Sequence, residues 1–175
     1  MIPLPSPVAA VIVVVGAAVV LPSCGSGRDG AVPAAPSTAL RSACDTVVVE
    51  PLDPRSAQHL LPGAPVPSYA ADPPTSGPHL SGGAVSGAQA EPLAGPVQVA
   101  VLEEGGVIVQ YRPNLPEEGK ARLAELTGDK VVVAPNPALP DPVVATAWRH
   151  RLACRSVDLA ALRAFISERA GKGPG

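Results

Sequence analysis

The side chains of this sequence best suited to hold a metal ion or move a proton are three histidines and two adjacent glutamates. The histidines are His59, His79 and His150. A neutral imidazole presents a nitrogen lone pair near neutral pH, which makes histidine a common ligand of transition metals. Glu103 and Glu104 could each add a carboxylate. We take His59, His79, Glu103 and Glu104 as the candidate polar site.

The strength of metal binding depends on how many of these ligands converge. A zinc site generally uses three or four N, O or S ligands, and the sequence offers His79, a carboxylate and at most His59 in addition. We therefore expect weak binding, no stoichiometric metal and no cofactor. The alternative role for His79 is to donate hydrogen bonds within a proline-rich loop. In a strand, Glu103 and Glu104 would point to opposite faces and could not form an acid–base dyad; in a turn, both would be solvated.

A serine nucleophile is not favoured. Residues 75–77, Thr-Ser-Gly, do not match the G-x-S-x-G elbow of serine hydrolases, and no partner base is evident. Pro73 and Pro74 fix an extended backbone, and Gly77 before Pro78 allows a sharp turn. These structural roles explain the residue types, so we assign no catalytic residue.

The first cysteine lies in a pattern typical of lipid attachment. Leu21-Pro22-Ser23-Cys24 resembles a bacterial lipobox, and it follows an unbroken run of apolar and glycine residues from Val8 to Leu21. That run has the length of a signal-peptide core and is shorter than the about 20 residues that span a bilayer. We predict a signal peptide over residues 1–23 and lipid attachment at Cys24. The alternatives are an uncleaved signal anchor and a buried core helix.

The other two cysteines form an even pair. If Cys24 is acylated, Cys44 and Cys154 remain in an oxidising compartment, and a disulfide between them is the economical inference. The alternative is two unpaired buried thiols. A metal-binding cysteine pair is not favoured, because no second Cys or His lies at a close ligand spacing to either residue.

Composition indicates one domain with much irregular backbone. The chain has 175 residues, 23 prolines and 17 glycines. Its 13 Lys and Arg nearly balance 15 Asp and Glu, which predicts no nucleic-acid partner. We expect a disordered tether over residues 24–43, a single globular domain over 44–170 and a disordered tail over 171–175.

The regular elements are expected mainly in the second half of the domain. We predict strands over residues 97–102, 107–111, 130–134 and 143–148, the first two joined by a hairpin turn at 103–106. One helix is expected to begin at Pro116 and end by Gly128, and another to run from a Ser156 cap to Gly171, with Leu159, Leu162 and Ile166 facing the sheet.

The first half, residues 45–96, should be a long irregular segment rich in proline and glycine, with one short β-prone run at residues 47–49. The expected fold class is α+β: a small, mostly antiparallel sheet, covered on one face by one or two helices.

Residues 73–79 read PPTSGPH, and this segment resembles the bacterial family called domain of unknown function 3105. The resemblance spans about residues 44–168. It implies a secreted or membrane-anchored protein without an assigned activity. Family members also carry an H-x-L-E-H-G motif, where this chain has AVLEEG at residues 100–105. Both motif histidines are therefore replaced, by Ala100 and Glu104, while Glu103 remains. The resemblance thus implies a metal or proton-transfer site that is partly degenerate here.

Two functional hypotheses follow. The leading one is a lipoprotein anchored at the extracytoplasmic face of the cell membrane, with a non-catalytic domain that binds or spaces a protein or small-molecule partner. The rival is a metal-binding protein or metalloenzyme relative with a partly degenerate histidine site.

The lipid anchor gives the first testable prediction. Cys24→Ser should release the protein from membranes or leave it unprocessed, because each buried acyl methylene contributes about 0.8 kcal/mol to membrane binding. Intact-mass analysis of the membrane fraction should find a chain that begins at an acylated Cys24. An unmodified Cys24, or retention of residues 1–23, would contradict the prediction.

Overall fold

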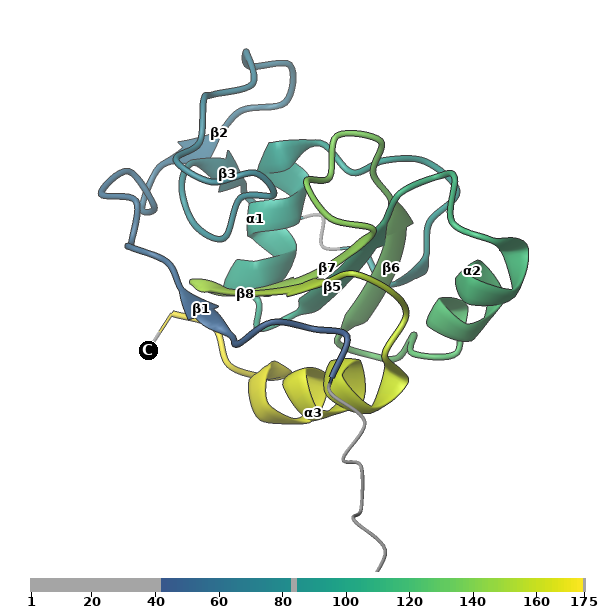
Figure 1. The fold of residues 1–175 in the computed structure, drawn as a ribbon. Coiled ribbons are helices and arrows are strands. Elements are labelled where there is room, and N and C mark those ends of the chain that lie inside the picture. Colours follow the sequence, from purple (N-terminus) through teal and green to yellow (C-terminus); the bar gives the residue numbers. More distant parts are fainter. Residues whose placement is uncertain (1–41, 83–84, 175) are drawn as a thin grey trace, which may run out of the picture. The chain divides into compact units, whose positions relative to one another are not determined.

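The computed structural model describes residues 42–82 and 85–174 (Figure 1). The predicted signal peptide, Cys24 and most of the predicted tether lie outside these residues. The helices are α1 (Gly95–Glu103), α2 (Glu117–Ala124) and α3 (Leu159–Arg169). The strands are β1 (Val48–Val49), β2 (His59–Leu60), β3 (His79–Leu80), β4 (Gly87–Ala88), β5 (Val107–Tyr111), β6 (Val131–Pro135), β7 (Val143–Ala147) and β8 (His150–Cys154). Within the described residues, no helix is long and apolar enough to span a bilayer.

Six strands form one sheet, in the order β1-β8-β7-β5-β6-β4. The pairs β1–β8, β7–β8 and β5–β7 are antiparallel, whereas β4 and β5 both pair in parallel with β6. A second, two-stranded parallel sheet joins β2 to β3. The fold is therefore α+β with a mostly antiparallel main sheet, as predicted.

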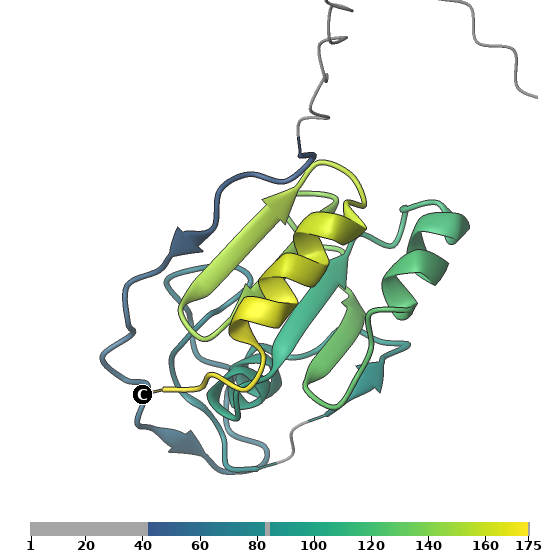
Figure 2. The same ribbon diagram turned by 90° about the horizontal axis from the view of Figure 1, so that it is seen from below.

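Helices cover both faces of the main sheet rather than the single face we expected (Figures 1 and 2). Val107 and Val109 of β5 pack with Leu162 and Phe165 of α3, and Leu123 of α2 joins the same cluster. Alternate strand residues point the other way, and Ile108, Val132 and Trp148 pack there with Val99, Val101 and Leu102 of α1. Because both faces are covered, β5, β6 and β7 are apolar almost throughout.

The predicted hairpin at residues 97–111 is wrong in its first strand. Residues 97–102 belong to α1, and only 107–111 form a strand. Nearly the whole helix is buried, including Gln98 and Ala100, so its sequence lacks the polar face that marks an amphipathic helix. A short apolar run of this kind cannot be assigned to helix or strand from periodicity alone. The sequence feature that could have indicated a helix start is Pro96, which lies in the first turn of α1.

The ends of the other helices also differ from the expectation. α2 follows Pro116, as predicted, but ends at Ala124, before Gly128. The N-cap of α3 is Asp158 rather than Ser156, since the Asp158 side chain accepts a hydrogen bond from the Ala161 N–H at 3.0 Å. Residues 171–174, expected within a disordered tail, turn back toward the end of α1, and the Gly171 N–H donates to the Gly105 carbonyl at 2.8 Å.

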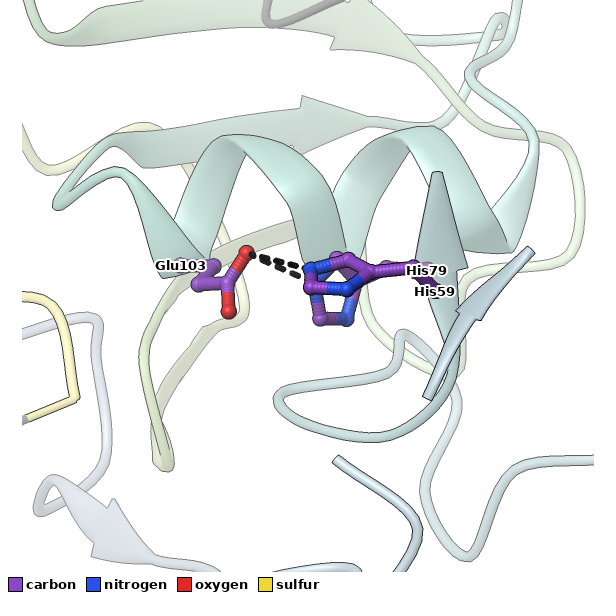
Figure 3. A group of neighbouring side chains, drawn as sticks. All are labelled: His59, His79 and Glu103. Carbon is purple, nitrogen blue, oxygen red and sulfur yellow. Dashed lines mark ion pairs between the residues drawn. The ribbon is translucent and has the colours of Figure 1, made fainter. Parts of the chain in front are cut away.

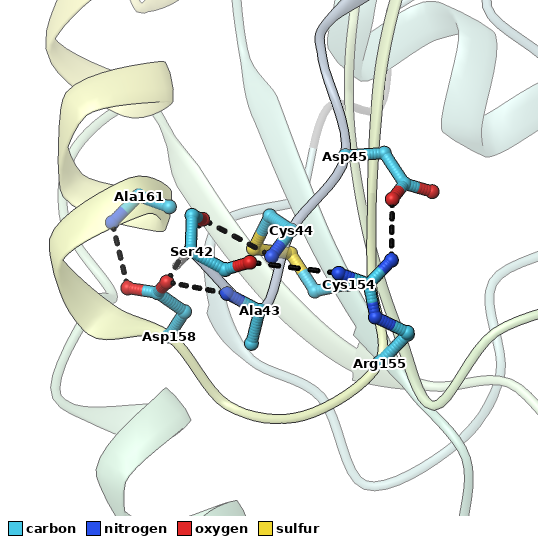
Figure 4. Close-up of a disulfide and its surroundings, with 8 residues drawn as sticks. All are labelled: Ser42, Ala43, Cys44, Asp45, Cys154, Arg155, Asp158 and Ala161. Carbon is cyan, nitrogen blue, oxygen red and sulfur yellow. Dashed lines mark hydrogen bonds and ion pairs between the residues drawn. A yellow bond between two sulfur atoms is a disulfide. The ribbon is translucent and has the colours of Figure 1, made fainter. Parts of the chain in front are cut away.

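A disulfide joins Cys44 to Cys154 across 110 residues, which confirms the predicted pair (Figure 4). Hydrogen bonds fasten the same segment beside it. The Asp158 carboxylate accepts from Ser42 Oγ at 3.0 Å and from the Ala43 N–H at 3.1 Å. These bonds hold the start of the described chain against β8 and the first turn of α3, and the bonds to Asp158, led by that from the Ala161 N–H, lower the pKa of its carboxyl.

Reduction of this disulfide should destabilise the domain. The chain-entropy model values a loop of this length at up to about 5 kcal/mol of unfolding free energy. Denaturant unfolding of the oxidised protein, the reduced protein and a Cys44→Ala, Cys154→Ala variant should give equal, lowered stabilities for the last two. Equal stability of all three would show that the remaining contacts hold the domain without the bond.

Candidate functional site

Three of the four candidate site residues converge at one place, from three separate elements (Figure 3). His59 lies in β2, His79 in β3 and Glu103 at the end of α1. The Nε2 atom of His79 is 2.6 Å from a Glu103 carboxylate oxygen, and the Nε2 atom of His59 is 3.9 Å from the same oxygen. The two imidazole rings meet edge to face, with centroids 4.8 Å apart. All three potential ligand atoms lie within 4.8 Å of one another.

Parallel pairing of two very short strands sets the two histidines side by side. His59 is the register partner of His79, and the His79 N–H donates to the Gln58 carbonyl at 3.1 Å. The exposure of the two side chains differs: 52% for His59 and 0% for His79. His79 is therefore fixed in the interior, while His59 lies at the surface.

The PPTSGPH segment is a loop built to place His79. Gly77 has a φ of +129°, and a Cβ on it would lie 2.9 Å from the Tyr69 ring. Tyr69 also holds the next residue, since its hydroxyl donates to the Pro78 carbonyl at 2.7 Å. Burial raises the pKa of Tyr69 to about 12, so the hydroxyl remains a donor over the neutral range. Only glycine at position 77 permits this close ring contact.

Thr75 and Ser76 also connect the loop to the rest of the domain. Ser76 Oγ accepts a hydrogen bond from the Asp53 N–H at 3.0 Å, and the Thr75 carbonyl accepts from the Arg149 N–H at 2.9 Å. Asp53 is buried and bound by Arg55 at 2.7 Å, a contact that lowers the pKa of the Asp53 carboxyl. Both loop residues are thus explained by structure. Sequence reasoning did not assign Asp53 or Tyr69 a role, although Asp53-Pro54 is a signal for the turn that Asp53 makes to the Arg55 N–H.

The hydrogen bonds of His79 define where its protons lie. Nδ1 is 2.9 Å from the Gly77 carbonyl oxygen, which can only accept, so Nδ1 carries a proton. Within residues 42–82 and 85–174 the buried Nε2 has no hydrogen-bond partner, although a Glu103 oxygen lies 2.6 Å away. In neutral His79, Nε2 would direct a lone pair toward a carboxylate. A cation placed between the two atoms would accept both lone pairs.

The remaining candidates lie elsewhere. Glu104 is the C-cap of α1 and lines a separate cavity with Ser86 and Lys130. His150 opens β8, and its Nδ1 is 2.7 Å from the Trp148 carbonyl. Glu103 is the last residue of α1 and does not lie in a strand, whereas Glu104 and Gly105 form a turn after the helix, within the turn expected over residues 103–106, and Glu104 is exposed. Ala100 lies three residues before Glu103 in α1, so the two residues are on the same side of the helix. A histidine at position 100, the first histidine of the H-x-L-E-H-G motif, would therefore lie on the side of Glu103.

Comparison with known proteins identifies the family. The model described as "Protein of unknown function (DUF3105)" matches residues 63–175. The chain belongs to the DUF3105 family. The DUF3105 match includes the PPTSGPH loop, His79 and Glu103, whereas Cys44 and His59 precede it. Neither the curated proteins nor the solved structures contain a match to this chain.

Proposed function

We propose that this protein is an extracytoplasmic, lipid-anchored member of the DUF3105 family whose domain binds one divalent transition-metal ion through His59, His79 and Glu103. The observation that carries the proposal is the environment of His79 Nε2. It is buried, has no hydrogen-bond partner among the described residues, and lies 2.6 Å from a Glu103 carboxylate oxygen. A metal ion resolves this contact by accepting both the nitrogen and the oxygen lone pairs.

The second ring nitrogen of His79 supports the same conclusion. Metal-bound histidines almost always donate their other N–H to a carbonyl or carboxylate, which fixes the tautomer and the ring orientation. His79 does this through Nδ1 and the Gly77 carbonyl. The competing explanation is an imidazolium–carboxylate ion pair. The absence of a hydrogen bond between Glu103 and Nε2 counts against that pair, because a charged hydrogen bond gains its strength from a direct N–H···O line.

The spacing of the three ligands fits a small ion after modest adjustment. Metal–ligand bonds of about 2.0 to 2.2 Å at tetrahedral angles place ligand atoms roughly 3.3 Å apart. The distances from Glu103 to the two histidines, 2.6 Å and 3.9 Å, lie on either side of that value. Reaching that spacing requires Glu103 to move away from the buried His79 and His59 to move toward Glu103, and both moving side chains are partly exposed.

The ligand set also indicates the class of metal. Two imidazoles and one carboxylate favour zinc, copper, nickel or cobalt over calcium or magnesium, which prefer oxygen ligands. Three protein ligands leave a coordination position for water or a partner. From the sequence alone we expected weak binding; the proposal of a defined site rests on the position of His59 beside His79. We assign binding and no catalytic step.

The proposed location rests on the lipobox at Cys24, and a buried disulfide between Cys44 and Cys154 suits an oxidising compartment outside the cytoplasm. The leading hypothesis from the sequence, a non-catalytic binding module, is compatible with a bound metal ion. The ion would then hold a partner or stabilise the irregular first half of the domain, residues 45–96.

Titration calorimetry of the purified full chain with zinc should find one site per chain. His59→Ala and Glu103→Gln should each weaken binding by at least about a hundredfold, since loss of even a hydrogen-bond partner of a ligand costs up to that much. Both side chains are partly exposed, so these variants should fold. Binding should also weaken on acidification, because protons compete for the imidazole nitrogens.

Glu104→Gln is the matched control for Glu103→Gln, because the neighbouring carboxylate lines a different cavity. It should leave zinc affinity unchanged. The proposal fails if the natural chain shows no saturable zinc binding, or if the two glutamate variants lose affinity equally.

A further inference from the structure

A cavity of about 510 Å³ opens beside the metal-ligand cluster. Its walls come from distant parts of the chain: Leu52 before β2, Trp148 and Arg149 in the turn between β7 and β8, Arg169 at the end of α3, and Lys172 in the segment after that helix. Glu103 also contributes to the wall. Pockets of roughly 300 to 1,000 Å³ typically hold small-molecule ligands. The metal cluster does not account for this space, since neither His59 nor His79 lines it.

The charge of the cavity wall is predominantly positive. Arg149, Arg169 and Lys172 contribute three cations, and Glu103 is the acidic side chain among the lining residues. Glu103 is itself in contact with His79 at 2.6 Å. Three basic residues and one glutamate that is already in contact with His79 give the lining a net positive charge, which attracts an anion.

The cations retain donors that a ligand could use. The Nε atom of Arg169 is buried and has no hydrogen-bond partner within the described part of the chain. The ion pair of Arg169 is long, 3.6 Å to the exposed carboxylate of Glu168. Among residues 42–82 and 85–174, no acidic group lies within ion-pair distance of Lys172. A guanidinium and an ammonium with spare donors match the geometry and charge of a carboxylate or phosphate.

The rest of the wall is apolar. Trp148 is nearly buried and belongs to the α1-side cluster, and Leu52 adds a half-exposed aliphatic side chain to the lining. An aromatic surface beside converging cations favours a ligand that combines an apolar body with a charged end. A free inorganic anion would leave this apolar wall without a partner.

We propose that this cavity binds a small organic anion, with its carboxylate or phosphate on Arg169 and Lys172 and its apolar body against Trp148. The site is separate from the proposed metal centre, and the two share only Glu103 as a boundary. The C-terminal segment completes the wall, since the Gly171 N–H donates to the Gly105 carbonyl and Gly173 lies against the Glu103 carbonyl.

The single tryptophan of the chain makes the test direct, because Trp148 lines the cavity and all tryptophan emission reports on it. Titration of the full chain with phenyl phosphate, in the presence of a chelator, should change the emission saturably. Added salt should weaken binding. Lys172→Ala and Arg169→Gln should each reduce the affinity about tenfold. Arg163→Gln is the matched control, since Arg163 is an exposed arginine of the same helix outside the cavity, and it should bind as the natural chain does.

Three results would overturn the proposal. One is the lack of a saturable change with phenyl phosphate, and another is equal affinity for benzyl alcohol, which lacks the charge. The third is saturable binding of phenyl phosphate that is seen without the chelator and lost when the chelator is added, because the anion would then be bound by a metal ion and not by the basic residues of the cavity. Chelator-resistant binding in a chain that fails to bind zinc would support this site while contradicting the metal proposal.

Discussion

A buried imidazole has two nitrogens to satisfy, and in this domain they face two different parts of the chain. Nδ1 of His79 donates to the carbonyl of Gly77 in its own loop, while Nε2 faces Glu103 at the end of α1. Burial makes an unsatisfied polar atom costly, so both contacts constrain the structure. The loop must keep its turn at Gly77, and α1 must end where Glu103 can reach His79.

The rest of the fold maintains these two constraints. α1 is fixed because its apolar residues pack on one face of the main sheet, while α3 covers the other face. The loop is fixed from outside by Tyr69 and Asp53, which hold Pro78 and Ser76. The disulfide fastens the start of the described chain to the far end of β8. A site made of short, irregular elements is thus supported by a rigid sheet, which is the arrangement that binding loops generally have.

Local chemistry was sufficient to predict part of this structure. The β-branched runs of β5, β6 and β7, the proline before α2 and the cysteine pair each carry a signal that does not depend on distant residues. The failures share one cause. α1 is buried on nearly all sides, so its short apolar sequence lacks the polar face of an amphipathic helix and could not be told from a strand. The N-cap of α3 was assigned to Ser156 because the sequence does not show that Asp158 also binds Ser42.

The candidate site was predicted by residue type but not by geometry. Sequence reasoning selected His59, His79 and both glutamates, yet it could not show that His59 pairs with His79 across two-residue strands, or that Glu103 faces the cluster while Glu104 lines another cavity. The anion cavity was missed altogether because its walls span residues 52 to 174. Such long-range contacts depend on the assembled fold and leave no local pattern.

X-ray absorption at the zinc edge of the zinc-loaded protein tests the proposed three-ligand site directly. Two imidazole nitrogens and one carboxylate oxygen should lie at about 2.0 to 2.2 Å from the ion, and His59→Ala should remove one imidazole contribution. A spectrum with a single imidazole or none, or one that is unchanged by His59→Ala, would contradict it.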